Sequence, residues 1–302
     1  MTLLVVGSIA FDSIETPHGN AERVLGGSAA YLSYASSFYT NTRLMGPVGE
    51  DFPQEALDVF GEQGIDTSGV ARLPGKTFFW HGRYLENMDR RETIQVDQNV
   101  LGQYSPVVPE KFRDSEYIFM ANAQPSLQLK VLEQVPRRKL AFCDTMNLWI
   151  ETERDGLLEL LKKVDGIVLN EDEARLVTGA GCPTLVAAGR RIQKMGPEHV
   201  VIKKGEHGAL LLTGEAVFAI PAYPLEHVFD PTGAGDSFGG GMMGHLARTG
   251  EMNFENMKRA LLYGSITASF TVEDFSLGRL RKISLDDIES RCCEFVEMMR
   301  LD

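Results

Sequence analysis

The chain has 302 residues, of which 43% are hydrophobic, so it can bury the core of one large α/β domain or of two small ones. A formal net charge of −12 argues against a general binder of nucleic acid or of anionic membranes, because such proteins need clustered Lys and Arg. Four cysteines without a Cys-x-x-Cys spacing argue against a zinc site or disulfide framework and favour a cytoplasmic protein, and no stretch approaches the ~20 apolar residues of a membrane span.

The chain opens with a predicted buried strand over residues 3–9, which Asp12 follows. In open α/β sheets, ligands bind at the carboxyl ends of the strands, where a carboxylate can hold two hydroxyl groups of a ligand. The alternative is an Asp that closes a turn, and the residues alone favour it. Gly26 and Gly27 then precede a predicted helix over 29–39, and two glycines there allow the backbone to approach a bound molecule closely.

Residues 76–84 alternate in polarity and are rich in aromatic side chains, and residues 93–96 form a second predicted strand that pairs with them. Trp80 in this hairpin can stack on a sugar or a base. Aromatic side chains on a sheet more often belong to the core, and both interpretations stay open.

From Glu116 onward, short apolar strands alternate with helices, a pattern that predicts a parallel sheet with right-handed crossovers. The predicted strands are 117–121, 140–143, 166–169 and 199–203, and the predicted helices are 126–134, 152–163, 171–178 and 185–194. Asn122 and the segment 144–147 come at the ends of two of these strands, on the edge where we expect ligands.

Asn170 and Glu173 are three residues apart at a predicted helix start, so their side chains face the same way. An amide and a carboxylate suit a hydrated Mg²⁺ ion, but the same pair also forms a helix capping box. Farther on, Lys204, Gly205 and Gly208 form a turn after a strand. Lys204 can reach a phosphate there, although a solvent-exposed lysine is the simpler interpretation.

The stretch Asp230–Gly241 carries the most specific pattern, because a turn-forming Asp-Pro pair leads into Gly233, Ala234 and Gly235 at the start of a predicted helix. The free N–H groups and the positive dipole of a helix N-terminus attract an anion, and these small residues leave room for it. Asp236 lies where a phosphate would arrive, which suggests phosphoryl transfer with Asp236 as the general base. An acidic cap on a glycine-rich turn is the alternative.

Positions 230–243 resemble the second signature of the PfkB (ribokinase-like) family of carbohydrate and nucleoside kinases. The resemblance implies an α/β fold with a ribokinase-like, mostly parallel central sheet flanked by helices. It also implies a single domain over 1–302 with a small β lid built from about 12–25 and 75–100. In this family Asp236 deprotonates the acceptor hydroxyl, and the amides of 233–235 form the anion hole for the phosphoryl group.

The resemblance also implies roles for other residues. Gly26, Gly27 and Ser28 look like an imperfect form of the family's first signature, because Tyr31 stands where that pattern has an asparagine. Residues 46–52 resemble the family's Gly-x-Val-Gly-x-Asp turn, whose Asp is Asp51. The expected acceptor-binding residues are Asp12, Gly26, Gly27, Ser28, Tyr31, Asp51, Trp80 and Asn122. The expected nucleotide-binding residues are Asn170, Lys204, Gly205, Gly208 and Gly264. Mg²⁺ is expected at Asn170 and Glu173, and Asp230 and Thr232 form a candidate K⁺ site.

The leading hypothesis is therefore a kinase that uses ATP and Mg²⁺, with K⁺ as a candidate activator, to phosphorylate a hydroxyl group of a small sugar or sugar-like molecule. A nucleoside kinase on the same scaffold is the first alternative. The second is a ligand sensor that has lost catalysis. A P-loop kinase is disfavoured, because no Gly-x(4)-Gly-Lys-Ser/Thr motif occurs. The lid of such kinases often forms a dimer contact, so a homodimer through the lid is a further expectation.

Overall fold

The fold is taken from a computed structural model that describes residues 1–88 and 90–301. A central sheet organises it. Its strands are β1 (Thr2–Val6), β4 (Asn41–Gly49), β5 (Asp66–Leu73), β8 (Tyr117–Met120), β9 (Leu140–Asp144), β10 (Gly166–Asn170), β11 (His199–Lys203), β12 (Ala209–Thr213) and β13 (Ala216–Ile220). These nine strands lie in the order β13-β12-β11-β10-β9-β8-β1-β4-β5. Neighbouring strands are parallel, except that β12 is antiparallel to both β11 and β13. The predicted α/β fold with a mostly parallel sheet is confirmed.

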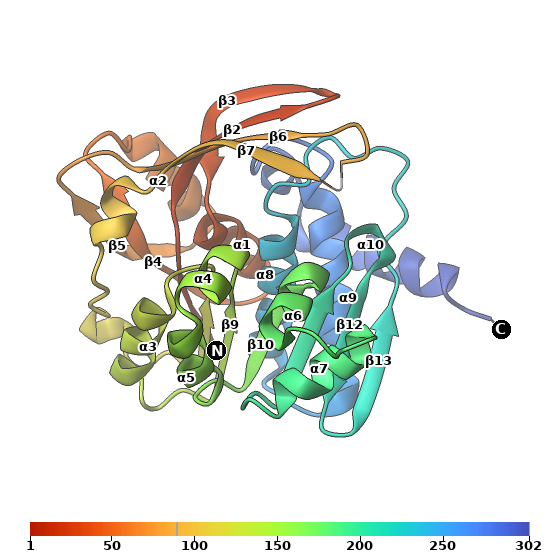
Figure 1. Cartoon of the computed structure of the whole chain (residues 1–302). Coiled ribbons are helices and arrows are strands. Elements are labelled where there is room, and N and C mark those ends of the chain that lie inside the picture. Colours follow the sequence, from red (N-terminus) through yellow and green to blue (C-terminus); the bar gives the residue numbers. More distant parts are fainter. Residues whose placement is uncertain (89, 302) are drawn as a thin grey trace.

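Helices cover both faces of this sheet (Figure 1). One face carries α3 (Pro125–Gln134), α4 (Asn147–Thr152), α5 (Arg154–Leu161), α6 (Glu171–Thr178) and α7 (Leu185–Gln193), and the other carries α1 (Ser28–Ser37), α2 (Gln54–Glu62), α8 (Ala234–Thr249), α9 (Phe254–Thr271) and α10 (Leu285–Met298). Strand β1 explains the two layers, because successive side chains of a strand point to opposite faces. Leu3 and Val5 pack into the core with α1, α8 and α9, whereas Leu4 and Val6 pack into the core with α3, α5 and α6.

A second sheet lies above the carboxyl edge of the central one in Figure 1. It contains β2 (Ala10–Thr16), β3 (Gly19–Gly26), β6 (Phe78–Tyr84) and β7 (Arg91–Asp97), in the order β3-β2-β6-β7. These are the strands expected for the lid, and we call this four-stranded sheet the lid. The predicted pairing of 76–84 with 93–96 is confirmed, since β6 and β7 are antiparallel.

Two local predictions need correction. The first strand ends at Val6, and Asp12 is the third residue of the lid strand β2, because the chain leaves the central sheet after Val6 and pairs with β6. The helix predicted over 152–163 is present as α5 but spans only Arg154–Leu161, because Glu153 has a φ of −130° and a ψ of 39°, which are not helical. The preceding short helix α4, which ends at Thr152, was not predicted.

Glycines inside α8 let the helices approach one another closely. A Cβ atom on Gly240 would lie 2.5 Å from the backbone oxygen of Leu32 in α1, and one on Gly241 would lie 2.7 Å from that of Tyr263 in α9. The Gly-x-Gly-x-x-Gly pattern at 239–244 therefore serves helix packing. Within the described residues, no helix is both long and apolar enough to cross a membrane.

Candidate active site

The start of α8 contains residues 233–235, the loop that the sequence predicts to bind an anion, which we call the anion-binding loop. Gly233 is its N-cap residue and has a φ of 76°, a left-handed conformation that glycine adopts without strain. The loop lies flat on the ring of Tyr31, because a Cβ on Gly233 would lie 2.4 Å from that ring. Ala234 and Gly235 follow as the first two helical residues. The Ala234 amide donates to the backbone oxygen of Pro231 at 3.2 Å, so this N–H group, contrary to the prediction, is not free.

Asp236 lies in this first turn and is partly buried. Burial raises its pKa above the ordinary value for an aspartate, and the nearby cations Lys203 and Arg91 oppose the increase. A raised pKa improves a carboxylate as a proton acceptor near neutral pH. This environment fits a general base better than it fits an acidic helix cap, which would be exposed.

Asp12 lies in the same space and is only 4% exposed. Its carboxylate accepts a hydrogen bond from the backbone amide of Gly27, and a Cβ on Gly26 would overlap the carboxylate, at 2.0 Å from Oδ2. Burial, followed by the charge of Asp230, raises the pKa of Asp12 to about 7. The two glycines therefore make room for Asp12 and hold it at the site.

Three further residues that were predicted to bind the acceptor are Ser28, Tyr31 and Asn122. Ser28 Oγ lies 3.0 Å from Ser8 Oγ and 3.5 Å from the backbone oxygen of Asn122. The Asn122 side chain is held by α4, because its Oδ1 accepts the indole N–H of Trp149 at 3.0 Å and its Nδ2 lies 3.1 Å from Met146 Sδ.

The hydroxyl of Tyr31 is unusual, because it is buried without a hydrogen-bond partner among the described residues. The ring is 1% exposed, and the acidic side chains of Asp12, Asp230 and Asp236 lie near enough to help burial raise the pKa of the phenol. An unpaired buried hydroxyl is costly, and a ligand hydroxyl is a natural partner for it.

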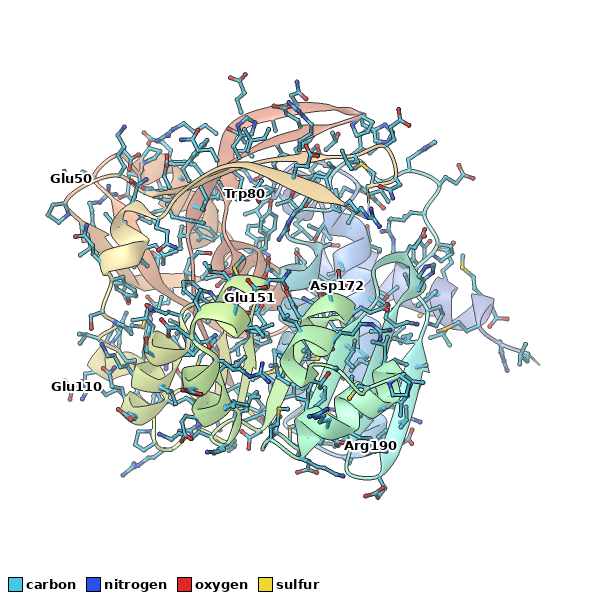
Figure 2. The ribbon with its side chains drawn as sticks, in the orientation of Figure 1. Glu50, Trp80, Glu110, Glu151, Asp172 and Arg190 are labelled. Carbon is cyan, nitrogen blue, oxygen red and sulfur yellow. The ribbon has the colours of Figure 1, made fainter. Side chains whose placement is uncertain are left out.

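The lid brings Trp80 to the site, on the ribbon that passes above α4 and α6 in Figure 2. Trp80 is the strand partner of Asp12, so both point from the same face of the lid. Its ring lies over Gly82, its indole N–H donates to Thr93 Oγ1 at 3.3 Å, and the Arg91 guanidinium lies 5.5 Å from the ring centroid. The ring is half-buried, which distinguishes it from a core residue.

Two further lid side chains contact the anion-binding loop. Thr232 Oγ1 donates to the hydroxyl of Tyr84 at 3.1 Å, and Arg91 hydrogen-bonds the same Tyr84 side chain. Arg91 also lies near Glu173 and Asp236, whose charges help raise its pKa. The lid therefore places a guanidinium over the acidic site, and this residue was not predicted from the sequence.

Asp51 occupies the base of the lid instead. Its Oδ1 accepts hydrogen bonds from the backbone and side chain of Thr77, both at 2.7 Å, and its Oδ2 accepts one from Arg23 at 2.7 Å. Both carboxylate oxygens are thus already bonded to residues that flank the lid strands. Its acceptor-binding role stays a prediction without support from these contacts.

Asn170 and Glu173 form the capping box of α6. Asn170 Oδ1 accepts the Glu173 amide at 2.8 Å, and Glu173 Oε2 accepts the Asn170 amide at 2.7 Å. Burial raises the pKa of Glu173, and the charge of Lys203 opposes this. Among the described residues no cluster of three or more His, Cys, Asp or Glu side chains is arranged to hold a metal ion by itself. The Mg²⁺ role of the pair stays a prediction, and the capping box is what these contacts show.

Lys203 and Asp144 also lie in the site, and of the two the sequence analysis singled out only Asp144, as the first residue of the strand-end segment 144–147. They end β11 and β9, and both lie near Asp236. Burial, followed by the charge of Asp236, raises the pKa of Asp144 strongly, and its Oδ1 is buried without a hydrogen-bond partner among the described residues. For Lys203 the available signal was its position at a strand end, which drew attention to Asn122 and Asp144.

The expected nucleotide turn lies after β11. Gly205 and Gly208 have φ values of 56° and 84°, and Lys204 Nζ bonds the backbone oxygen of His207 at 3.3 Å. Gly264 is buried in α9, where a Cβ would lie 2.7 Å from the Phe238 oxygen, so its missing side chain serves the packing of α9 on α8. The nucleotide roles of these four residues stay predictions.

Asp230 is fully buried just before the anion-binding loop. Its Oδ1 accepts the Thr232 amide at 2.8 Å, and its Oδ2 has no hydrogen-bond partner among the described residues. Burial raises the pKa of Asp230 to about 6. A bound cation would satisfy this oxygen, so the residues present fit the predicted K⁺ site.

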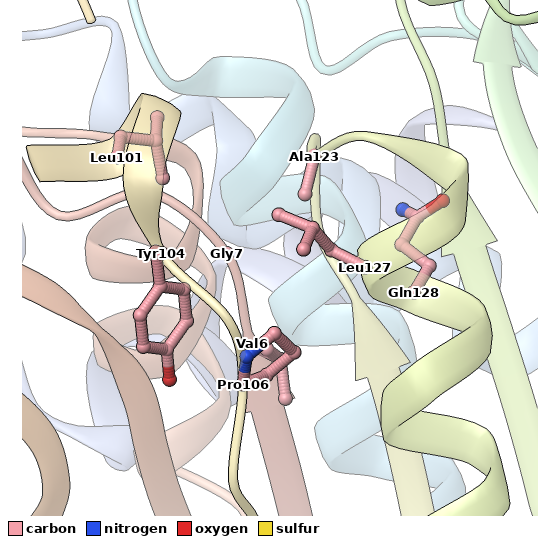
Figure 3. Close-up of a pocket in the computed structure, with 8 residues that line it drawn as sticks. All are labelled: Val6, Gly7, Leu101, Tyr104, Pro106, Ala123, Leu127 and Gln128. Atoms are coloured by element: carbon pink, nitrogen blue, oxygen red, sulfur yellow. The ribbon is translucent and has the colours of Figure 1, made fainter.

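A small apolar cavity lies beside the site (Figure 3). Its volume is about 20 Å³, and it is lined by Val6, Gly7, Leu101, Tyr104, Pro106, Ala123, Leu127 and Gln128. One water molecule needs at least roughly 10–15 Å³, so the cavity is far too small for a substrate.

Comparisons with known proteins point to one family. Residues 2–281 match the model of the pfkB family carbohydrate kinases. The chain is similar to a cytidine kinase from Thermococcus kodakarensis, with 30% identity over 254 residues that cover 82% of this chain and 89% of the relative. It is also similar to a nucleoside kinase from Methanothermobacter thermautotrophicus, with 26% identity over 90% of this chain and 89% of the relative.

The fold has close counterparts among solved structures. One from E. coli, which carries the provisional name ribokinase II and holds ATP and Mg²⁺, superimposes with a TM-score of 0.80 at 20% identity and covers 97% of this chain and 99% of its own. Together with the family match over most of the chain, this confirms the expected ATP-dependent phosphorylation of a hydroxyl group. The chain belongs to the PfkB family of carbohydrate kinases.

Proposed function

We propose that the acceptor is a nucleoside, which this kinase phosphorylates on a hydroxyl group of the ribose. The observation that carries this proposal is that aromatic rings and a thioether lie around Asp12, the carboxylate that is predicted to bind the acceptor. Asp12 pairs in register with Trp80. Ser28, which follows the two glycines at Asp12, lies 3.5 Å from the backbone oxygen of Asn122. The Asn122 side chain accepts the indole N–H of Trp149 and lies 3.1 Å from Met146 Sδ. A sugar and a base can each stack on an aromatic ring, but a nucleoside presents a flat base in addition to its hydroxyl groups, so it can use both the aromatic surfaces and Asp12.

In the proposed reaction, Asp12 binds hydroxyl groups of the acceptor and Asp236 accepts the proton of the attacking hydroxyl. That oxygen forms a bond to the γ-phosphorus of ATP while the bond to ADP breaks. The amides of the anion-binding loop stabilise the charge of the moving phosphoryl group. Mg²⁺ would be held beside Asn170 and Glu173, and when bound it neutralises phosphate charge.

Acceptor screening tests this proposal. Turnover of ATP would be measured with a panel of nucleosides, pentoses, hexoses and inositols at equal concentration. The relative from Thermococcus kodakarensis is named a cytidine kinase, so cytidine is the first compound to test. We expect kcat/KM for the best nucleoside to exceed that for any free sugar by at least about tenfold, which is ~1.4 kcal/mol of transition-state binding.

Two outcomes contradict the proposal in different ways. Faster turnover of a free sugar would restore the sugar kinase hypothesis. Absence of turnover with every acceptor, combined with tight binding of one of them, would favour the ligand sensor.

We further propose K⁺ as the activator, with the unpartnered Asp230 oxygen and Thr232 at its site. A cation there would fix the adjacent loop whose amides bind the phosphoryl group. Activity at constant ionic strength should rise when K⁺ replaces tetramethylammonium. The Asp230→Asn variant should lose this response, and an equal response in both proteins would refute the site.

We also propose that the lid forms a homodimer contact. Strand β7 is an edge strand of the lid, and it exposes Ile94 at 46% and Val96 at 52%. Exposed apolar side chains on an open strand edge favour association. Sedimentation should show a dimer for the natural chain and a monomer for Ile94→Asp, and a monomeric natural chain would contradict the proposal.

A further inference from the structure

Lys203 ends β11 next to Asn170, which is its partner in β10. Its ammonium lies against the anion-binding loop, because a Cβ on Gly235 would be 2.6 Å from Lys203 Nζ. The adjacent Lys204 extends away to the carbonyl of His207. Gly235 thus leaves space that the Lys203 ammonium occupies.

Three carboxyl groups surround this ammonium from different elements. They are Asp144 from β9, Glu173 from α6 and Asp236 from α8. Burial raises the pKa of each, and the positive charge of Lys203 opposes that increase. Even so, among the described residues no carboxylate oxygen lies within 4.0 Å of Lys203 Nζ, the distance that defines an ion pair. The ammonium therefore has hydrogen-bond donors to offer a ligand.

We propose that Lys203 is a catalytic residue that binds the γ-phosphoryl group beside the loop amides during its transfer. The proposal rests on the kinase activity described above. A lysine ammonium is a compact charge with three donors, which suits the spread charge of a phosphoryl group in transfer. Lys203 gives up no proton in this step; the acceptor proton goes to Asp236, and the electron pair of the broken bond leaves with ADP.

The same charge controls the general base. Asp236 is faced by Lys203 from β11 and Arg91 from β7, which lower its pKa, while the acids Asp12, Asp144 and Glu173 and the phenol of Tyr31 also lie within electrostatic reach. Removal of Lys203 leaves Arg91 as the cation acting on Asp236. The pKa of Asp236 should then rise, so that a higher pH is needed to ionise the base.

The test compares Lys203→Met and Lys203→Arg in the full chain, with Lys194→Met as a control for the loss of one exposed positive charge. Dissociation constants for MgATP and MgADP, kcat, and the pH dependence of kcat would be measured for each. Lys203→Met should lower kcat about 10²–10³-fold, as loss of one transition-state donor does elsewhere. It should also raise the ratio of the MgATP to the MgADP dissociation constant and move the acidic limb of the profile to higher pH.

Lys203→Arg should keep the acidic limb near that of the natural chain, and Lys194→Met should behave as the natural chain in every assay. Equal weakening of MgATP and MgADP with an unmoved acidic limb would overturn the proposal, as would a Lys203→Met variant with more than about a third of natural kcat. If no acceptor is turned over by the natural chain, the proposed function fails, but the ratio of nucleotide dissociation constants still decides the role of Lys203. Lys203→Gln carries the same expectations if Lys203→Met does not fold.

Discussion

Asp236 meets two physical requirements of a general base in phosphoryl transfer. It lies in the first turn of α8 next to the loop amides, and burial raises its pKa above the ordinary value of an aspartate, which improves it as a proton acceptor. The charges of Lys203 and Arg91 oppose that increase in pKa.

Replacement of Asp236 by Asn should therefore affect the reaction far more than the binding of ATP. We expect kcat to fall by ~10²–10⁴-fold, because the amide cannot accept the proton, while the dissociation constant of MgATP stays within a few-fold. Asp58→Asn, an exposed substitution on α2, provides the matched control. A variant that keeps more than about a third of natural kcat would remove Asp236 from the role of base.

The residues of the site differ in how far the sequence revealed them. Gly233 and Asp236 were predictable, because the chemistry of a helix N-terminus depends on consecutive residues. Lys203 and Arg91 were not, since they reach the site from a different strand and from the lid. Of two adjacent lysines the sequence analysis selected Lys204, and only the pairing of β11 with β10 distinguishes them.

At the scale of elements, the lid determines what the acceptor meets. Strand β2 carries Asp12 and strand β6 carries Trp80 on the same face, so one rigid sheet presents both a carboxylate and an aromatic ring. The ring is half-buried and is held by Thr93 and Arg91, which orders it before a ligand arrives. Preordering of an aromatic ring reduces the entropy cost of stacking a base on it.

Trp80→Ala should accordingly produce a stable protein with weak acceptor binding. We expect the KM of the acceptor to rise by about tenfold, since base stacking on an aromatic ring contributes ~1–3 kcal/mol. ATP hydrolysis without transfer should increase, because a less closed lid admits water. A lowered Tm with normal acceptor kinetics would show instead that Trp80 is a core residue.

The elements themselves were largely predictable from their patterns. The helix expected over 171–178 has those bounds in the structure, because the capping box fixes its start and Gly179 follows its end. The short helix α4 was not predicted from the local pattern, and its Trp149 bonds Asn122, a residue distant in the sequence. The position of Asp12 in the lid also depended on pairing between β2 and β6, which a local pattern cannot specify.

At the scale of the whole molecule, the fold concentrates negative charge at one place in a chain whose net charge is already −12. Buried acidic groups with raised pKa values come from β2, β9, α6 and the loop that leads into α8. Each binds its proton more tightly in the folded chain than in the unfolded chain. Their stabilising contribution is complete at low pH and is lost as pH rises through the folded pKa.

Asp12 allows this to be tested, because its pKa rises from 3.8 to about 7 on folding. Its contribution to the free energy of unfolding is fully present below about pH 4 and is lost by about pH 7, at ~1.4 kcal/mol for each pH unit of that window. Asp12→Asn stays neutral at every pH and does not lose this contribution. Relative to the natural chain without ligands, its Tm should therefore increase by several degrees between about pH 5.5 and pH 8.

Thermal unfolding in the absence of nucleotide and Mg²⁺ measures this difference across the pH range. Asp58→Asn, whose exposed side chain lies on α2, should follow the natural chain at every pH. Saturating acceptor should reduce the difference at pH 8, because its hydroxyl groups donate hydrogen bonds to the ionised Asp12 carboxylate and stabilise the charged form. A Tm difference that stays constant from about pH 5.5 to pH 8 would mean that Asp12 is ionised in the folded chain throughout, and that the acceptor meets a carboxylate with an ordinary pKa.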